Sequence, residues 1–292
     1  MTRPFRFGVN MLDIGTGAAW REKCRKAEAL GYDVVLVPDH LGMPAPFPAL
    51  VAAAEVTQRP RLGTFVLNSG FWNPALLARE AATTDLLTGG RLELGLGAGY
   101  VQAEHDSAGL PFGSPRERVD HLERTLTEVP RLLGDPEHRP AAVRSRVPML
   151  VGGNGKRVLR IAAQHADIMA FTGGGAGPDG QPRPLAPAAL EESVNAFRAF
   201  EGDRAEPAEL NFLVQIVAVG GDPRVKAREL MGYREELGVE DFLDHPSLLT
   251  GSVTEIADSL RAHRKRYGFS YFTILEPYLE AFARVIEELQ GS

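Results

Sequence analysis

The sequence predicts a (β/α)8 barrel, a closed cylinder of eight parallel strands surrounded by helices. Short runs rich in apolar residues alternate along the chain with longer stretches of helical period, which is typical of a parallel sheet. Eight such strands in 292 residues suit one barrel better than an open doubly wound sheet, which remains the alternative. Because no linker interrupts the pattern, we expect a single domain over residues 1–292.

Eight segments have the composition of strands. Residues 33–37 are an unbroken apolar run, as expected for a strand covered on both faces. The other seven are short runs bounded by Gly, Pro or polar residues. We expect strands at residues 5–10, 33–37, 61–67, 91–97, 147–151, 167–171, 211–219 and 271–275.

Segments of helical period lie between and after these strands. Gly31 ends the first, and Pro74 begins another, at a position where its missing N–H costs nothing. We expect helices at residues 19–30, 47–57, 74–87, 115–133, 156–165, 188–200, 224–237, 254–267 and 278–289.

Two long connections follow the fourth and sixth strands, at residues 99–115 and 173–187. Both therefore lie on the face of the barrel where the strands end. The second, Gly173–Pro187, is dense in Gly and Pro and is either a mobile lid over the site or disordered.

The composition excludes several classes of protein. The formal net charge of −6 and the pI of about 5.7 leave no basic face for nucleic acid. The single cysteine, Cys24, forms neither an internal disulfide nor a thiolate metal site. The sequence shows neither a signal peptide nor an apolar stretch of membrane-spanning length. We therefore expect a cytoplasmic protein whose partner is a small-molecule substrate, with no nucleic acid and no membrane.

The catalytic motifs of many barrel enzymes are missing. The seven histidines form no H-x-H or H-E-x-x-H pattern, so no metal site is expected. All five lysines fall in expected helices, which argues against imine chemistry inside a barrel. The glycine-rich run 95–99 has Tyr100 where the dinucleotide fingerprint requires its third glycine. These absences favour a bound organic cofactor that carries the chemistry.

Polar residues follow the second and third expected strands. Asp39 can accept a hydrogen bond from a ring N–H or a sugar hydroxyl, and His40 can give or take a proton near neutral pH. Asn68 offers a carboxamide to a heterocycle, and Phe71 and Trp72 could wall a flat ring or substrate. The structural alternatives are a helix cap with a packed histidine, and a strand-to-helix turn with an aromatic plug.

Glycines mark two further strand ends. The alternating glycines of residues 95–99 would let a ligand lie against bare backbone. The turn Gly152-Gly153-Asn154-Gly155 runs into a helix N-terminus, whose free N–H groups and dipole favour a phosphate, with Lys156 or Arg157 adding charge. A plain tight turn is the alternative. Thr172 ends the sixth strand and could face a substrate.

These residues make the sequence similar to the luciferase-like monooxygenase superfamily, in particular to its branch that uses coenzyme F420, the 8-hydroxy-5-deazaflavin hydride carrier. The Asp39-His40 pair is the form common in that branch, whereas flavin monooxygenases more often have Glu-His-His. The resemblance implies a bacterial luciferase-like TIM barrel. It runs nearly end to end and is most specific at residues 73–78, 87–100, 151–155, 157–163 and 166–167.

The resemblance also implies roles for the candidate residues. His40 would be the proton donor beside the ring or the substrate, with Tyr100 or Glu104 as second candidate. A β-bulge with a non-prolyl cis peptide would lie behind the ring, near Phe65–Val66. The other residues expected to hold the head, backbone face and tail of the cofactor are Asp39, Asn68, Ala98, Gly99, Gly152, Gly153, Gly155 and Lys156.

The chain departs from the family's sugar-phosphate dehydrogenase at two places. A glutamate base follows the fourth strand of that enzyme, where this chain has Tyr100. A lysine follows its sixth strand, where this chain has Gly173-Gly174-Gly175. Glucose 6-phosphate is therefore not the expected substrate. Four aromatic residues, Phe71, Trp72, Tyr100 and Phe112, favour an apolar or aromatic substrate.

We therefore expect an oxidoreductase that passes a hydride between coenzyme F420 and a small, apolar organic substrate. One alternative is an FMN-dependent monooxygenase that receives reduced flavin from a separate reductase. A third hypothesis is a non-catalytic flavin-binding or storage protein. A cofactor-reducing partner enzyme and a homodimer are expectations that rest on the resemblance alone.

Overall fold

The strands close into a barrel, so the open-sheet alternative is wrong. The structure is a computed structural model and describes residues 3–290 except 145, 177–181, 223 and 226–238. The strand order is β3-β2-β1-β13-β10-β7-β6-β5-β4, and pairing of β3 with β5 completes the cylinder. The barrel strands are β1 (Arg6–Asn10), β2 (Val34–Val37), β3 (Arg61–Thr64), β4 (Leu67–Asn68), β5 (Leu92–Gly97), β6 (Met149–Gly152), β7 (Ile168–Phe171), β10 (Glu209–Val214) and β13 (Phe269–Leu275).

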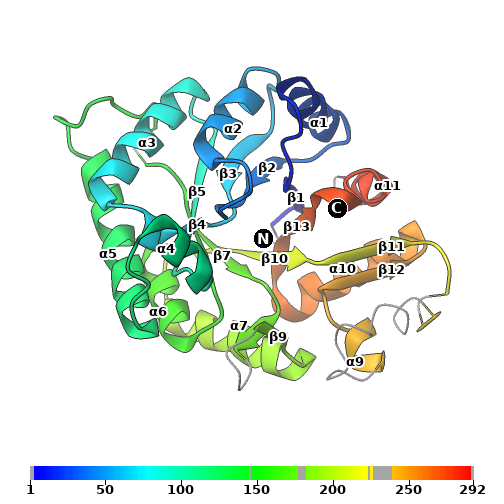
Figure 1. Ribbon diagram of the computed structural model, residues 1–292. Coiled ribbons are helices and arrows are strands. Elements are labelled where there is room, and N and C mark those ends of the chain that lie inside the picture. The colour runs from blue at the N-terminus through cyan, green and yellow to red at the C-terminus, as the bar shows by residue number, and fades with distance from the viewer. Residues whose placement is uncertain (1–2, 145, 177–181, 223, 226–238, 291–292) are drawn as a thin grey trace.

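Helices form the outer layer around these strands (Figure 1). Two of them begin with a capping box, in which Ser114 pairs with Glu117 and Ser252 with Glu255. The helices are α1 (Gly17–Ala29), α2 (Pro46–Ala54), α3 (Pro74–Leu87), α4 (Gln102–Ala108), α5 (Pro115–Leu133), α6 (Lys156–His165), α7 (Pro187–Glu201), α9 (Val239–Leu243), α10 (Val253–Tyr267) and α11 (Ala283–Leu289), with short 3-10 turns η1 (Ser69–Phe71) and η2 (Glu276–Tyr278).

The apolar core has two parts. The larger part lies between the helices and the outer face of the barrel, and the smaller part fills the cylinder. Alternate residues of each strand point to opposite faces, so Val35 and Val37 join the outer core while Val34 and Leu36 join the inner one. All four residues of β2 are buried, as expected from the unbroken apolar run.

A charged network closes the end of the cylinder where the strands begin. Glu93, 3% exposed, accepts from Arg6 Nη2 at 2.7 Å and from Arg61 Nε at 2.5 Å. Arg6 also pairs with the buried Glu209. Burial lowers the pKa of Arg6, but the charges of Glu93 and Glu209 outweigh that effect and raise it. These charged side chains therefore fill that end of the barrel.

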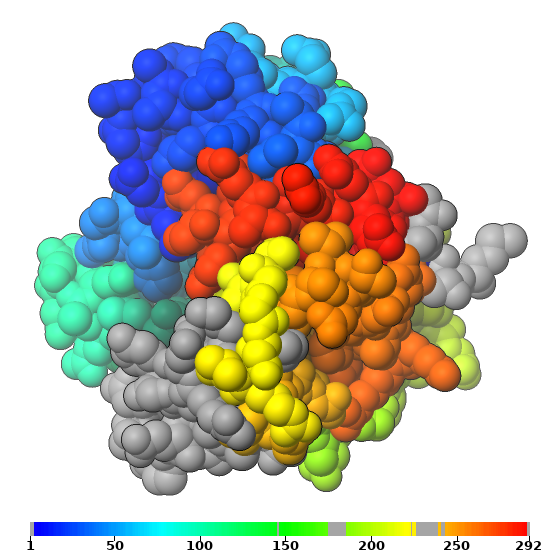
Figure 2. All heavy atoms as spheres, turned by 90° about the vertical axis from the view of Figure 1, so that its right-hand side faces the viewer, coloured from blue at the N-terminus to red at the C-terminus, as the bar shows by residue number. Residues whose placement is uncertain are grey.

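The first and last segments of the chain pack side by side. Tyr32 Oη donates to the Leu279 carbonyl oxygen at 3.0 Å, and Lys26 forms an ion pair with Glu280. Figure 2 shows the red C-terminal segment lying between the blue N-terminal segment and the orange α10 region. Pairing of β1 with β13 joins the same segments within the barrel. In the part of the chain that the structure describes, no helix has the length and apolarity to cross a membrane.

Two expected strands are each divided. The third is interrupted after Thr64 by a cis peptide bond between Phe65 and Val66, where the resemblance implied one. The expected strand 211–219 becomes β10 and β11 (Ile216–Val219). Strand β11 leaves the barrel to pair with β12 (Leu248–Gly251), a strand that the sequence analysis did not predict.

The connections also differ from expectation. The segment 99–115 contains α4, and the final helix begins only at Ala283, after η2. Strands β8 (Gly174–Ala176) and β9 (Pro182–Pro184) pair antiparallel within the segment that we expected to be a lid or disordered. Most of the helix expected at 224–237 lies outside the described residues.

Candidate active site

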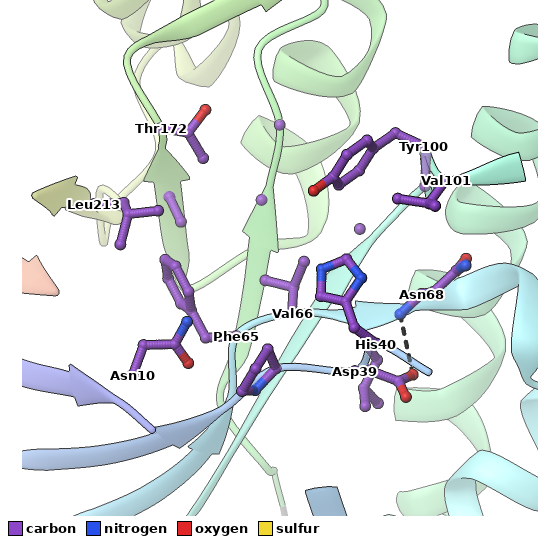
Figure 3. Close-up of a pocket in the computed structure, with 18 of the residues that line it drawn as sticks. Asn10, Asp39, His40, Phe65, Val66, Asn68, Tyr100, Val101, Thr172 and Leu213 are labelled. Atoms are coloured by element: carbon purple, nitrogen blue, oxygen red, sulfur yellow. Dashed lines mark hydrogen bonds between the residues drawn. The ribbon is translucent and has the colours of Figure 1, made fainter. Parts of the chain in front are cut away.

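A cavity of about 810 Å³ opens where the barrel strands end. Figure 3 shows its floor at Phe65 and Val66, with His40 and Tyr100 on one side and Asn10 and Leu213 on the other. Most residues expected at the site line this cavity, namely Asp39, His40, Phe65, Val66, Asn68, Ala98, Gly99, Tyr100, Glu104, Gly152, Gly153, Gly155 and Thr172.

Glycines allow Val66 to form a central ridge in the floor. A Cβ at Gly97 would lie 2.8 Å from Val66 Cγ2, and a Cβ at Gly152 would lie 3.1 Å from Val66 Cγ1. Side chains at these positions would push against the ridge. The two neighbouring strands that end at these glycines, β5 and β6, therefore present backbone to the cavity, which provides a surface for a flat ring.

The N-terminus of α6 borders the same cavity. Its N-cap is Gly155, which supplies no side-chain cap, and a Cβ there would meet nothing within 4 Å. The first N–H groups of a helix have no partner within the helix, and the helix dipole favours an anion beside them. The sequence expectation of an anion cradle next to the glycine turn therefore fits this geometry.

Asp39 is held by two donors at the edge of the cavity. Its Oδ2 accepts from Asn68 N at 3.2 Å and from Trp72 Nε1 at 3.1 Å. Burial raises the pKa of Asp39, while the hydrogen bonds from Trp72 and Asn68 and the charge of His40 act to lower it. The carboxylate is thus fixed in orientation by groups behind it.

Glu104 lies beside His40. His40 Nδ1 is 2.8 Å from Glu104 Oε1, and the Tyr100 ring meets the imidazole edge to face with centroids 6.0 Å apart. A carboxylate accepts, so the bond places a hydrogen on His40 Nδ1 and leaves Nε2 for another partner. Burial and the charge of Glu104 raise the pKa of Tyr100.

Asn68 is joined to His105, a residue that the sequence analysis did not select. His105 is fully buried on α4, and its Nε2 lies 2.9 Å from Asn68 Nδ2. The other carboxamide atom, Asn68 Oδ1, accepts from Gly70 N at 3.0 Å. Consecutive residues of α4 therefore contact the two polar residues His40 and Asn68. The one signal in the sequence was that His105 lies in the long connection 99–115, on the face where the strands end.

Trp72 lies outside the cavity lining, so its expected contact with a substrate stays a prediction that the structure does not support. Its indole donates to Asp39 and packs edge to face on Phe47, with ring centroids 5.3 Å apart, outside the cavity lining. Phe71 and Phe112 also lie outside the lining. Their ring centroids are 4.9 and 5.1 Å from that of His105, which they flank. Of the four aromatic residues expected to favour an apolar substrate, only Tyr100 lines the cavity.

Two other expected residues have different outcomes. Lys156 is exposed at the first position of α6 and does not line the cavity, so a part in holding the cofactor tail stays a prediction. Thr172 does line it, and its Oγ1 accepts from Asn154 Nδ2 at 2.8 Å. Its contact with a substrate also stays a prediction.

The charges of the lining are acidic. Asp39 and Glu104 are its carboxylates, and none of the described residues in the lining is Lys or Arg. In the part of the chain that the structure describes, no group of three or more His, Cys, Asp or Glu residues could hold a metal ion. Fold and site together define a barrel protein whose cavity is lined partly by backbone and lies next to the N-terminus of α6.

Comparison with known proteins gives the family. A family model described as luciferase-like monooxygenase matches residues 4–268, so the chain belongs to this family. The chain is 28% identical to an F420-dependent glucose-6-phosphate dehydrogenase of Beutenbergia cavernae, with 89% of each chain covered. It is 31% identical to the oxygenase component of a flavin-dependent trigonelline monooxygenase of Acinetobacter baylyi, over 40% of this chain and 34% of that one.

A solved structure supports the fold. The structure of an F420-dependent secondary alcohol dehydrogenase, in complex with an F420-acetone adduct, superimposes with a TM-score of 0.77. The two chains are 16% identical, and the match covers 99% of this chain and 100% of the other. This likeness shows the same fold, and together with the family match it confirms the luciferase-like barrel that the sequence predicted.

Proposed function

We propose that the protein is a coenzyme F420-dependent oxidoreductase acting on a small, uncharged organic substrate. The observation that carries the proposal is the Val66 ridge between Gly97 and Gly152, with the Asp39-His40 pair on one side and the N-terminus of α6 on another. The similarity to an F420-dependent dehydrogenase over 89% of both chains supports the choice of cofactor.

The residues present fit such a cofactor. The ridge and the glycine-lined strands would support the flat ring, and the Asp39 carboxylate would accept from its polar edge. Gly153, Gly155 and the first turn of α6 would hold the phosphate of the tail. A side chain at Gly99 would collide with the Asn68 carboxamide, and the φ of +73° there also favours glycine.

His40 gives or takes the proton that the reaction of the substrate requires. Coenzyme F420, when bound, supplies or accepts the hydride. Because Glu104 occupies Nδ1 of His40, Nε2 is the atom that can give a proton to the substrate or take one from it. Glu104 holds the imidazole in this tautomer, and the Tyr100 ring limits the movement of His40.

An uncharged substrate follows from the electrostatics of the lining. A phosphate or carboxylate would lie near Asp39 and Glu104, and none of the described lining residues offers it a cationic side chain. Met43 and Tyr100 line the mouth and are 41% and 66% exposed, so an apolar group would cover them. A neutral ketone, secondary alcohol or activated alkene has this chemistry.

A titration tests the proposal. The purified protein is mixed with oxidised F420 and, separately, with FMN, and the cofactor fluorescence is followed. We expect saturable binding of F420 that is at least tenfold, or roughly 1.4 kcal/mol, tighter than binding of FMN. Tight binding of FMN without binding of F420 would refute the assignment. Turnover of neutral and carboxylate-bearing versions of one substrate then tests the preference for neutral compounds.

A flavin-dependent monooxygenase is the second candidate. It is supported by the similarity to the trigonelline monooxygenase component, although that match covers only 40% of this chain. Oxygen consumption in the presence of reduced FMN and a flavin reductase distinguishes it. We expect none above the rate of the reductase alone.

A further inference from the structure

Asn10 carries a buried carboxamide into the cavity. It is the last residue of β1, is 5% exposed and belongs to the cavity lining. Side chains alternate along a strand, and a Cβ at Gly8 would lie 3.0 Å from the Tyr271 ring inside the barrel. Asn10, two residues further on, faces the same interior. Figure 3 shows its nitrogen pointing up toward Phe65 and Leu213.

The surroundings of this carboxamide are apolar. Phe65, Ala170 and Leu213 belong to the core inside the cylinder and line the cavity with it. Asn10 Oδ1 is buried without a hydrogen-bond partner among the described residues. Burying an amide without partners is unfavourable, so each such group needs an explanation. The other amide inside the barrel, Asn211, also has a buried Oδ1 without a partner. Asn211 differs from Asn10 because its Nδ2 donates to Thr273 Oγ1 at 2.8 Å and because it does not line the cavity.

We propose that Asn10 is a ligand-binding residue, whose Nδ2, turned toward Phe65 in the cavity lining, donates to a carbonyl or hydroxyl oxygen of the molecule lying on the Phe65–Val66 floor. An amide suits a neutral acceptor, whereas an anion would be matched by Lys or Arg. Asn10 and His40 lie on opposite sides of Val66 in Figure 3, so one ligand layer above the ridge can meet both. The inference deepens the proposed function and rests on it.

The oxygen can belong to the cofactor ring or to the substrate, and the experiment separates the two. Asn10→Leu keeps the volume and removes the donor, and Asn10→Asp keeps the shape and replaces the donor with an acceptor. Asn211→Leu is the matched control, a similar change inside the barrel but away from the lining. For each variant we measure thermal unfolding, the F420 dissociation constant from fluorescence, and the substrate dissociation constant of the F420 complex.

We expect both Asn10 variants to weaken one of these two affinities by about tenfold. A weaker F420 affinity assigns the oxygen to the cofactor, and a weaker substrate affinity with unchanged F420 binding assigns it to the substrate. The Asn211 variant should leave both unchanged. Asn10→Leu should unfold at the wild-type temperature or above, because it removes an unsatisfied buried amide.

Two results overturn different claims. If folded Asn10→Leu and Asn10→Asp proteins bind cofactor and substrate as the wild type does, the carboxamide is satisfied by trapped water and the inference is wrong. If the wild type binds FMN and not F420, the proposed function is wrong. The same two affinities, measured with FMN, then still decide whether Asn10 binds the ligand.

Discussion

Asn68 and His105 form a buried hydrogen-bonded pair in which Asn68 is the donor and His105 the acceptor. Gly70 N–H can only donate, so it fixes Asn68 Oδ1 as the acceptor and turns Asn68 Nδ2 toward His105 Nε2. At the other side of the ring, His105 Nδ1 lies 3.0 Å from the Pro111 carbonyl oxygen, which can only accept. His105 is therefore neutral, with its hydrogen on Nδ1, and it joins Asn68 to the segment that follows α4.

This pair predicts different effects for two similar substitutions. His105→Gln can keep an acceptor near the position of Nε2, whereas His105→Asn keeps a polar group near Nδ1 and loses the contact with Asn68. We expect His105→Asn to weaken F420 binding by about tenfold and His105→Gln to stay near the wild type, since an unpaired buried amide is unfavourable. Fluorescence titration measures the affinities, and thermal unfolding checks that both proteins are folded. Equal affinities would show that Asn68 keeps its orientation without His105.

The Glu104–His40 contact predicts that the two residues act as a unit. We expect His40→Ala and Glu104→Ala each to lower kcat by about 100-fold, and the double variant to lower it no further than either single one. The F420 affinity should change little, because neither residue holds the tail. Asp106→Ala, a loss of an exposed carboxylate from the same helix, is the control and should leave kcat unchanged. Additive losses would mean that the two side chains work independently.

The burial of Asp39 predicts that its replacement stabilises the protein and weakens F420 binding, and that the gain in stability depends on pH. Burial raises its pKa, so the folded state binds the proton more tightly than the unfolded state, and stability is lost as pH rises through the folded pKa. We expect Asp39→Asn to raise Tm by a few degrees at pH 7, and the difference from wild type to vanish at pH values where Asp39 is protonated in both states. F420 binding should weaken in the same variant. A lower Tm at pH 7 would contradict this account of Asp39.

The buried ion pairs of Glu93 predict that its substitution lowers stability and leaves function unchanged. Glu93→Gln leaves Arg6 and Arg61 without their shared carboxylate, and we expect the free energy of unfolding to fall by about 3 kcal/mol in urea denaturation. F420 affinity and kcat should be unchanged, because the network lies at the opposite end of the barrel. Glu191→Gln, which breaks the exposed pair with Arg266, should cost less than about 1 kcal/mol. A comparable loss in both variants would show that burial of the network adds nothing.

The strand ends could be predicted from the sequence because each is a local pattern. Asp39 and His40 follow an apolar run, and Gly152 and Gly153 precede a helix, so their place at the barrel mouth follows from the topology. Trp72 was expected at the cavity but its indole donates to Asp39 outside the lining, and no local pattern specifies that direction. Asn10 and His105 were missed because a single amide or imidazole acquires its meaning only from its neighbours across the barrel.

Alternation of apolar strands and amphipathic helices determined the barrel, because period and strand number leave few ways to bury the apolar faces. The same local patterns determined which strand ends carry polar and glycine residues. Only the tertiary structure decided which of those side chains meet. The His40–Glu104 and Asn68–His105 contacts span 64 and 37 residues of chain. Such pairs depend on side-chain directions and loop paths that are set by packing across the whole barrel.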